Sequence, residues 1–217
     1  MKRRHFNALL SLGVLVWSIG TPALTWAQAR APVILVVGDS LSAEYGVKRG
    51  TGWVSLLQER LVQANRQEKM VNAGISGDTT AGGRSRLPAL LRQHQPSVVI
   101  IELGGNDALR GMPLSTTQAN LAAMARASRE AGAKVMLVGM EMPPNYGARY
   151  TRQFRELFQT VAKDEGTALV PFLLAGVADR PDALTLFQAD RIHPNETAQP
   201  LLADNVWPDL LKLLTSN

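Results

Sequence analysis

The sequence predicts an α/β protein in which helices cover both faces of a parallel sheet. Short apolar runs such as Val33–Val37 and Val98–Ile101 have the length of strands, and their near-continuous hydrophobicity is typical of strands buried on both faces. Segments with apolar residues at helical spacing separate these runs. This alternation predicts a parallel sheet with right-handed crossovers, in which ligands bind beyond the carboxyl ends of the strands.

Five apolar runs are the expected strands. In chain order they are Val33–Val37, Met70–Ala73, Ser97–Leu103, Lys134–Met140 and Thr167–Phe172. The third run is rich in β-branched residues, which favour strands. No repeat, low-complexity tract or linker interrupts residues 30–217, so we expect them to form a single domain that is large enough for its own core.

Five segments have the apolar spacing of helices. They are residues 53–64, 87–91, 119–131, 150–161 and 197–214. Gly132 ends the third of these helices. Prolines mark further boundaries, because proline lacks the N–H that a helix interior needs. We expect Pro88 near a turn or helix start, Pro200 in the first turn of the last helix, and Pro208 to kink or break that helix.

The first 29 residues have the features of a signal peptide. Residues 2–4 are basic, and Leu9–Ile19 is mostly apolar but too short to span a membrane comfortably. Ala27–Ala29 forms a small-x-small cleavage site, which predicts a mature chain that starts at Arg30. The alternative is an uncleaved N-terminal anchor. We therefore expect residues 1–29 to be a signal peptide and the protein to be periplasmic or secreted.

Charge and cysteine content exclude several classes of protein. The net charge of +5 falls to +2 for residues 30–217, because residues 1–29 hold three basic residues and no acidic one. Such a nearly neutral chain lacks the basic surface of a nucleic-acid-binding protein. The absence of cysteine excludes disulfides, thiolate metal sites, a cysteine nucleophile and a lipoprotein anchor.

Three residues supply the side chains of a serine hydrolase. Ser40 follows the first expected strand, and Asp190 and His193 form a late Asp-x-x-His pattern. A serine hydroxyl needs a base such as imidazole to take its proton, and a carboxylate then orients the imidazole. The rival base, His94, is expected at the opposite, amino-terminal edge of the sheet. Taken alone, each motif also fits an ordinary turn, helix cap or solvated surface.

Two other strand-end segments supply donors for an oxyanion hole. Gly77 can offer a backbone N–H, and Asn106 can offer its side-chain amide. The residues around Ser40 differ from a Gly-x-Ser-x-Gly elbow, because Ser42 stands where the second glycine would be. No phosphate-binding loop or dinucleotide fingerprint follows the first strand. The pattern therefore favours a serine hydrolase that differs from the standard α/β-hydrolases.

These segments resemble the conserved blocks of the SGNH (GDSL) hydrolases. The matching segments are Gly38–Ser42, Gly77–Thr79, Gly104–Asp107 and Asp190–His193. The sequence is most similar to the small periplasmic branch that includes multifunctional acyl-CoA thioesterases, lysophospholipases and arylesterases. The resemblance implies a flavodoxin-like three-layer α/β/α sandwich with a five-stranded parallel sheet. It also implies an enzyme that hydrolyses carboxylic esters and thioesters, with no metal or organic cofactor.

The resemblance also assigns roles to individual residues. It implies that Ser40 is the nucleophile, His193 the general base and Asp190 the carboxylate that orients His193. The backbone N–H groups of Ser40 and Gly77 and the side chain of Asn106 would form the oxyanion hole. Apolar or amphipathic residues near the rim are expected to bind the acyl group, or else simply to pack the loops. They are Leu109, Met112, Pro144 and Tyr146.

Two other functions remain open on the sequence. The first is a carbohydrate acetylesterase, since the same fold and side chains serve that reaction. The second is a periplasmic binding module that has kept the fold without catalysis. As partners we expect a small-molecule acyl ester or thioester, no nucleic acid and no stable membrane insertion after signal cleavage. The mature protein is expected to be a monomer.

Overall fold

The computed structural model describes residues 31–216. The predicted signal peptide, residues 1–29, and its cleavage site lie outside the described residues. Within residues 31–216, no helix is both long enough and apolar enough to cross a membrane.

The sheet has five parallel strands in the order β2-β1-β3-β4-β5. The strands are β1 (Val33–Gly38), β2 (Lys69–Asn72), β3 (Val98–Glu102), β4 (Lys134–Val138) and β5 (Ala168–Val170). This is the flavodoxin-like order, in which the strand order reverses between β1 and β3 and ligands bind at that point. Gly38 at the end of β1 pairs in register with Glu102 at the end of β3. The segments that follow these two residues therefore leave the sheet side by side.

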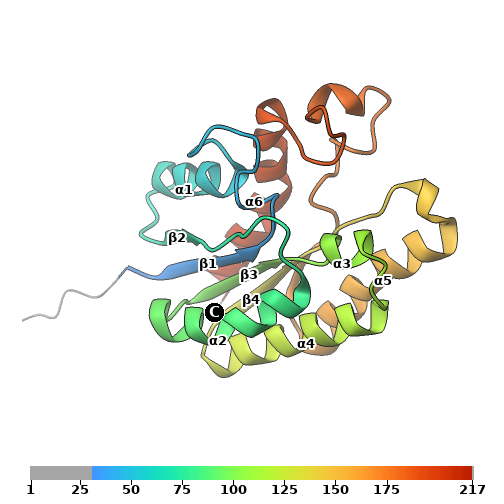
Figure 1. Cartoon of the computed structure of the whole chain (residues 1–217). Helices are drawn as coiled ribbons and strands as arrows, with labels where there is room; N and C mark the ends of the chain where they lie inside the picture. The colour runs from blue at the N-terminus through green and yellow to red at the C-terminus, as the bar shows by residue number, and fades with distance from the viewer. Residues whose placement is uncertain (1–30, 217) are drawn as a thin grey trace, which may run out of the picture. The chain divides into compact units, whose positions relative to one another are not determined.

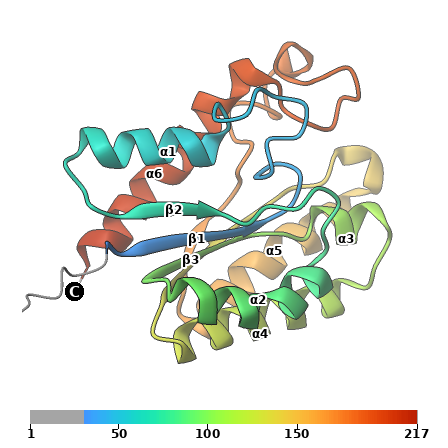
Figure 2. The same ribbon diagram turned by 60° about the vertical axis from the view of Figure 1, so that its left-hand side comes forward.

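Helices cover both faces of the sheet, as Figures 1 and 2 show. Helices α1 (Trp53–Gln63) and α6 (Gln199–Thr215) lie on one face, and α2 (Thr80–His94), α4 (Leu114–Glu130) and α5 (Ala148–Glu165) on the other. Side chains of β1 alternate between the faces, because successive residues of a strand point in opposite directions. Ile34 packs with α1 and α6, whereas Leu35 packs with the other three helices. The predicted α/β/α sandwich is thus confirmed.

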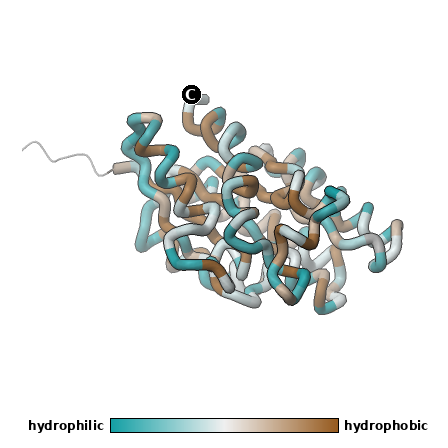
Figure 3. Tube along the Cα trace, turned by 90° about the horizontal axis from the view of Figure 1, so that it is seen from above, coloured by the Kyte–Doolittle hydropathy of each residue, from teal (hydrophilic) through white to brown (hydrophobic). Residues whose placement is uncertain are grey.

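Each face of the sheet has its own hydrophobic core. Trp53 is fully buried on the α1 side, and Phe154 and Phe158 are buried on the α5 side with their rings edge to face at 5.3 Å. Figure 3 shows hydrophobic stretches through the middle of the molecule and mostly hydrophilic ones at its periphery. Truncating a buried aromatic of this kind typically costs about 3–5 kcal/mol. The two cores therefore hold the strand ends, and the residues that follow them, in fixed positions.

The structure corrects the prediction for Pro88 and shows that Pro208 does not break its helix. Pro88 lies inside α2 and not near its start, and α6 continues through Pro208 without a break. A proline leaves the carbonyl four residues before it without its helical partner. Those carbonyls belong to Arg84 and Asp204, which are exposed residues like the prolines themselves, so water can satisfy them. Pro200 lies in the first turn of α6, as predicted.

Other differences concern the ends of elements. Helix α4, which corresponds to the predicted helix at residues 119–131, begins at Leu114, five residues earlier than predicted. Strands β3, β4 and β5 are shorter than predicted. A short helix, α3 (Gly105–Leu109), is absent from the sequence prediction. It is too short to show apolar periodicity, and its glycine-rich start is typical of a loop. Gly104, with φ of +121°, makes the sharp turn from β3 into α3.

Candidate active site

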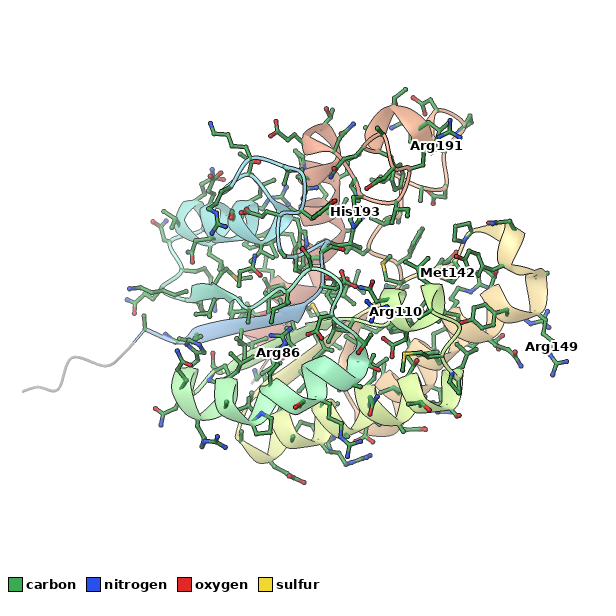
Figure 4. The ribbon with its side chains drawn as sticks, in the orientation of Figure 1. Arg86, Arg110, Met142, Arg149, Arg191 and His193 are labelled. Atoms are coloured by element: carbon green, nitrogen blue, oxygen red, sulfur yellow. The ribbon has the colours of Figure 1, made fainter. Side chains whose placement is uncertain are left out.

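Segments from distant parts of the sequence meet at the carboxyl edge of the sheet. Asn106, after β3, contacts Asp39, which follows β1. His193, from the long segment between β5 and α6, contacts Ser40. Figure 4 shows His193 directed from that segment toward the edge of the sheet. His94 is the last residue of α2 and precedes the amino end of β3, so it lies at the opposite edge, where the sequence predicted it.

Ser40, His193 and Asp190 form a continuous hydrogen-bonded chain. Ser40 Oγ lies 2.8 Å from His193 Nε2, and His193 Nδ1 lies 2.7 Å from Asp190 Oδ2. The Asp190 carboxylate also accepts the backbone N–H groups of Ile192 at 2.9 Å and His193 at 3.1 Å. The hydrogen bond from Ile192, followed by those from His193, lowers the pKa of Asp190 to about 2. Asp190 is therefore ionised at neutral pH and held in one orientation against the imidazole.

Asp39 anchors the turn that carries Ser40. Its side chain is buried, with only 3% exposed, and its two oxygens accept from the Leu41 backbone N–H at 3.1 Å and from Asn106 Nδ2 at 3.0 Å. Burial raises the pKa of Asp39 to about 6, although both hydrogen bonds oppose the rise. Asp39 thus ties the turn after β1 to the side chain of Asn106.

The three predicted oxyanion-hole donors lie on segments that converge on this edge. The Asn106 amide gives one hydrogen to Asp39 and has a second one free to donate elsewhere. Gly77 has φ of +80°, a conformation that favours glycine, and its carbonyl accepts from Arg110 at 2.8 Å. Within residues 31–216, neither the Ser40 nor the Gly77 backbone N–H has a hydrogen-bond acceptor. Both groups are therefore available to a bound oxygen.

Arg86 on α2 fixes the segment that carries Gly77, a role that the sequence analysis missed. Its guanidinium donates to Asp78 Oδ2 at 2.8 Å, to the Ala73 carbonyl at 2.6 Å and to the Gly38 carbonyl at 3.1 Å. Figure 4 shows Arg86 on α2. One side chain thus joins the ends of β1 and β2 and the turn at Gly77. The sequence gives no signal for this, because two of the three acceptors are backbone carbonyls.

Glu102 is a second buried carboxyl that the sequence analysis missed. Its Oε2 accepts from Ser42 Oγ at 2.7 Å and from the Asp39 backbone N–H at 3.3 Å. Its Oε1 has no hydrogen-bond partner within residues 31–216. Complete burial, reinforced by the nearby Asp39, raises the pKa of Glu102 well above its ordinary value. The end of β3 therefore places a buried carboxyl group with a raised pKa next to the turn that carries Ser40.

Tyr45 completes the surroundings of His193. The centroid of its ring lies 4.5 Å from that of the imidazole, with 44° between the ring planes, and half of the residue is exposed. Tyr45 also borders a hollow beside Ser40 and His193. The other residues that line this hollow are Leu41, Glu44, Val47, Pro194 and Gln199. A lone aromatic in a loop has no sequence signature, so Tyr45 was not predicted.

The residues predicted to bind the acyl group are not part of this hollow. Leu109 on α3 is 45% exposed, and Met112 after it is half-buried. Tyr146 is 39% exposed and ends the short 3₁₀ helix η1, which begins at Pro144. Their contribution to substrate binding stays a prediction.

Comparisons with known proteins identify the family of the chain. Residues 36–199 match the GDSL-like lipase/acylhydrolase family, which includes the segments of Ser40, Gly77, Asn106 and His193. The chain belongs to this family, and it is a hydrolase of ester bonds.

Relatives cover most of the chain. It is 54% identical to the esterase TesA of Pseudomonas aeruginosa over 187 residues, which are 86% of this chain and 92% of that protein. It is 41% identical to thioesterase 1/protease 1/lysophospholipase L1 of Escherichia coli over 181 residues, which are 83% of this chain and 84% of that protein. A crystal structure of TesA has a TM-score of 0.80 at 53% identity and covers 83% of this chain and 99% of that one.

Proposed function

We propose that this protein hydrolyses carboxylic esters and thioesters through an acyl-enzyme formed on Ser40. The observation that carries the proposal is the chain of hydrogen bonds from Ser40 Oγ through His193 to Asp190. An unassisted serine hydroxyl is a weak nucleophile, and contact with a basic imidazole nitrogen is what activates it. The ionised Asp190 selects the tautomer in which Nδ1 carries the proton and Nε2 is free to act as the base.

Acylation is the first half of the reaction. Ser40 Oγ attacks the carbonyl carbon while His193 Nε2 takes the hydroxyl proton, and the carbonyl oxygen becomes negative. The backbone N–H groups of Ser40 and Gly77 and the free hydrogen of the Asn106 amide stabilise that oxygen. Each donor of this kind typically contributes about 10²–10³ in rate. The carbon–oxygen or carbon–sulfur bond then breaks, and His193 protonates the leaving alcohol or thiol.

Deacylation uses the same groups in reverse order. His193 takes a proton from water as the water attacks the acyl-enzyme, and the same donors stabilise the second oxyanion. The carboxylic acid leaves as His193 returns the proton to Ser40. Asp190 stays ionised throughout, because its pKa of about 2 lies far below neutral pH.

The substrates proposed are aryl esters, fatty-acyl thioesters and lysophospholipids. The names of three relatives support this range, since one is an esterase, one a thioesterase and lysophospholipase, and one, from Vibrio mimicus and 39% identical, an arylesterase. Ser40 and His193 are only partly buried at the edge of the sheet, which suits leaving groups of different size. Exposed apolar side chains on the neighbouring segments, Leu109 and Tyr146 among them, are suited to contact an acyl chain.

Residues 1–29 are proposed to direct export and to be removed after Ala29. The basic start, short apolar stretch and small-x-small site support this, and residues 31–216 contain no helix able to cross a membrane. N-terminal sequencing of protein from a periplasmic extract is expected to begin at Arg30. A protein that keeps Met1 in the membrane fraction would instead indicate an uncleaved anchor.

The decisive test compares the wild type with Ser40→Ala on p-nitrophenyl esters from acetyl to palmitoyl. We expect activity that peaks at medium or long chains and falls by about 10³-fold or more in the variant. Ser115→Ala, a change at an exposed serine in the first turn of α4, is the matched control and should keep full activity. Labelling by a fluorophosphonate should likewise require Ser40 and His193.

The other outcomes separate the alternatives. Activity confined to acetyl esters, with acetylated sugars preferred, would favour a carbohydrate acetylesterase. No Ser40-dependent activity and no labelling would favour a binding module. Equal activity in the wild type and Ser40→Ala would rule out Ser40 as the nucleophile.

A further inference from the structure

Ser40 and His193 are joined by a second path besides their side-chain contact. The Tyr45 backbone N–H donates to the Ser40 carbonyl at 3.3 Å, and the Tyr45 carbonyl accepts from Gln188 Nε2 at 2.8 Å. The Gln188 backbone N–H in turn donates to the His193 carbonyl at 2.8 Å. Four residues thus form an unbroken series of hydrogen bonds from the Ser40 turn to the His193 loop.

Gln188 also holds the His193 loop in shape. Its carbonyl accepts from the Arg191 N–H at 2.9 Å, and its side-chain amide donates to the Pro194 carbonyl at 3.1 Å. An antiparallel bridge between Phe187 and Pro194 closes the base of the loop. The side-chain amide of Gln188 therefore donates to two segments. One is the His193 loop, through the Pro194 carbonyl, and the other is the segment that follows Ser40, through the Tyr45 carbonyl.

The absence of a side chain at Gly46 leaves room for the Gln188 amide. It has φ of +69°, and a Cβ on it would lie 2.6 Å from Gln188 Cδ and 2.7 Å from Nε2, which is too close for any side chain. The amide of Gln188 therefore occupies space that only glycine leaves open. We name Gln188, the Tyr45 carbonyl and Gly46 together the loop clasp.

We propose that Gln188 is a positioning residue, and that the loop clasp sets the contact between Ser40 Oγ and His193 Nε2. The inference rests on the proposed roles of Ser40 and His193. Those residues lie 153 positions apart in the sequence and on separate segments, so their distance depends on what joins the segments. A displacement of about 1 Å at a reacting group can cost about 10²-fold in rate, whereas the hydrogen bonds themselves contribute little to overall stability.

The first test is Gln188→Met, which keeps the length of the side chain and removes both donated hydrogen bonds. On a soluble p-nitrophenyl ester we expect kcat to fall about 10- to 100-fold and KM to change less than about threefold. The rate of Ser40 labelling by a small fluorophosphonate should fall in parallel, because labelling needs His193 as the base but no acyl-binding site.

Gln58→Met is the matched control. Gln58 is half-buried like Gln188, and its side-chain amide joins α1 to β2 through the Met70 N–H at 2.8 Å and the Glu68 carbonyl at 3.4 Å. Its replacement removes a similar pair of hydrogen bonds far from Ser40. We expect a similar change in Tm, with kcat and the labelling rate within about twofold of the wild type.

A second test changes Gly46, the residue of the loop clasp that faces the Gln188 amide. Gly46→Ala should displace the Gln188 amide and lower kcat and labelling to about the level of Gln188→Met. Gly46→Ala combined with Gln188→Ala should lose less kcat than the sum of the two single losses, because the two changes break the same contact. Fully additive losses would overturn the coupling.

The outcomes separate this inference from the proposed function. If Ser40→Ala is inactive while both Gln188→Met and Gly46→Ala keep kcat and labelling within threefold of the wild type, the loop clasp is wrong and the function stands. If Ser40→Ala keeps wild-type activity, the proposed function itself fails. A loss in Gln188→Met that Gln58→Met shares would show a general effect on stability and would also overturn the inference.

Discussion

Asp190 shows how much one side chain depends on the backbone around it. Its carboxylate accepts two backbone N–H groups besides the His193 ring, and these keep its pKa at about 2. A lowered carboxyl pKa stabilises the fold above the unfolded value of about 4, and this contribution is lost as the pH falls through 2. Asp190 therefore remains ionised above about pH 4, so it does not cause any loss of activity between pH 4 and 7.

Asp190→Asn should leave the loop folded and impair catalysis. An asparagine oxygen can still accept the backbone N–H groups, but its NH₂ cannot accept the Nδ1 proton of His193, so the wrong tautomer is favoured. We expect kcat to fall by about 10²–10⁴, and Tm to fall by no more than a few degrees as the stabilisation of the ionised carboxylate at this largely exposed site is lost. Steady-state kinetics and a thermal melt of the same preparation test this. Unchanged kcat would show that Asp190 serves only the loop.

The sequence indicated those residues of the candidate site that contact other side chains of the site. Ser40, Asp190, His193 and Asn106 belong to residue types that carry this chemistry; Ser40 and Asn106 follow predicted strands, and Asp190 and His193 form the Asp-x-x-His pattern. Gln188 contacts backbone carbonyls, which any sequence offers, so no pattern reveals its partners. Glu102 and Arg86 were missed for a related reason, because their roles follow from burial and from segments that meet only in three dimensions.

At the scale of elements, β1, β3 and β4 were predictable because each is an apolar run that is almost entirely buried, whereas the edge strands β2 and β5 are short and only partly buried. The ends of the helices were less predictable. Pro88 and Pro208 break the rule that proline ends helices, because the carbonyls they leave unpaired belong to exposed residues. Helix α3 has only five residues, and its position depends on Gly104 and on the packing of α4 behind it. Local sequence does not encode such dependence.

Replacing these two prolines should stabilise the protein. Pro88→Ala and Pro208→Ala restore an N–H that can donate to the carbonyl of Arg84 or Asp204, although the unfolded chain gains freedom. We expect each variant to gain about 1–2 kcal/mol, which corresponds to a few degrees in Tm for a domain of this size. Pro200→Ala is the control, because the first turn of α6 needs no N–H at that position, and it should give no gain. Calorimetry of the wild type and the three variants measures these changes in Tm.

At the scale of the whole molecule, the buried carboxyls beneath the site link stability to pH. Glu102 and Asp39 both have raised pKa values, that of Asp39 being about 6, because burial disfavours their charged forms. An acid with a raised pKa in the folded state holds its proton longer than in the unfolded chain. The free energy of unfolding therefore falls as the pH rises from about 4, and for Asp39 this fall ends near pH 6.

Glu102→Gln should remove part of this dependence. Glutamine can accept from Ser42 and from the Asp39 N–H as Glu102 does, and it stays neutral at every pH. Urea unfolding of both proteins between pH 4.5 and 8 should show the wild type losing stability relative to the variant, by at most about 1.4 kcal/mol per pH unit for one proton. Parallel curves would mean that Glu102 binds its proton equally in the folded and unfolded states.

The distance along the chain between Ser40 and His193 also has a consequence for synthesis. A growing polypeptide contains Ser40, Gly77 and Asn106 long before the ribosome reaches His193, 87 residues after Asn106. Until that point the nascent chain has a nucleophile without a base. If residues 1–29 direct export as proposed, a complete chain that crosses the membrane unfolded holds both residues but has not yet brought them together, so it cannot hydrolyse thioesters before it folds.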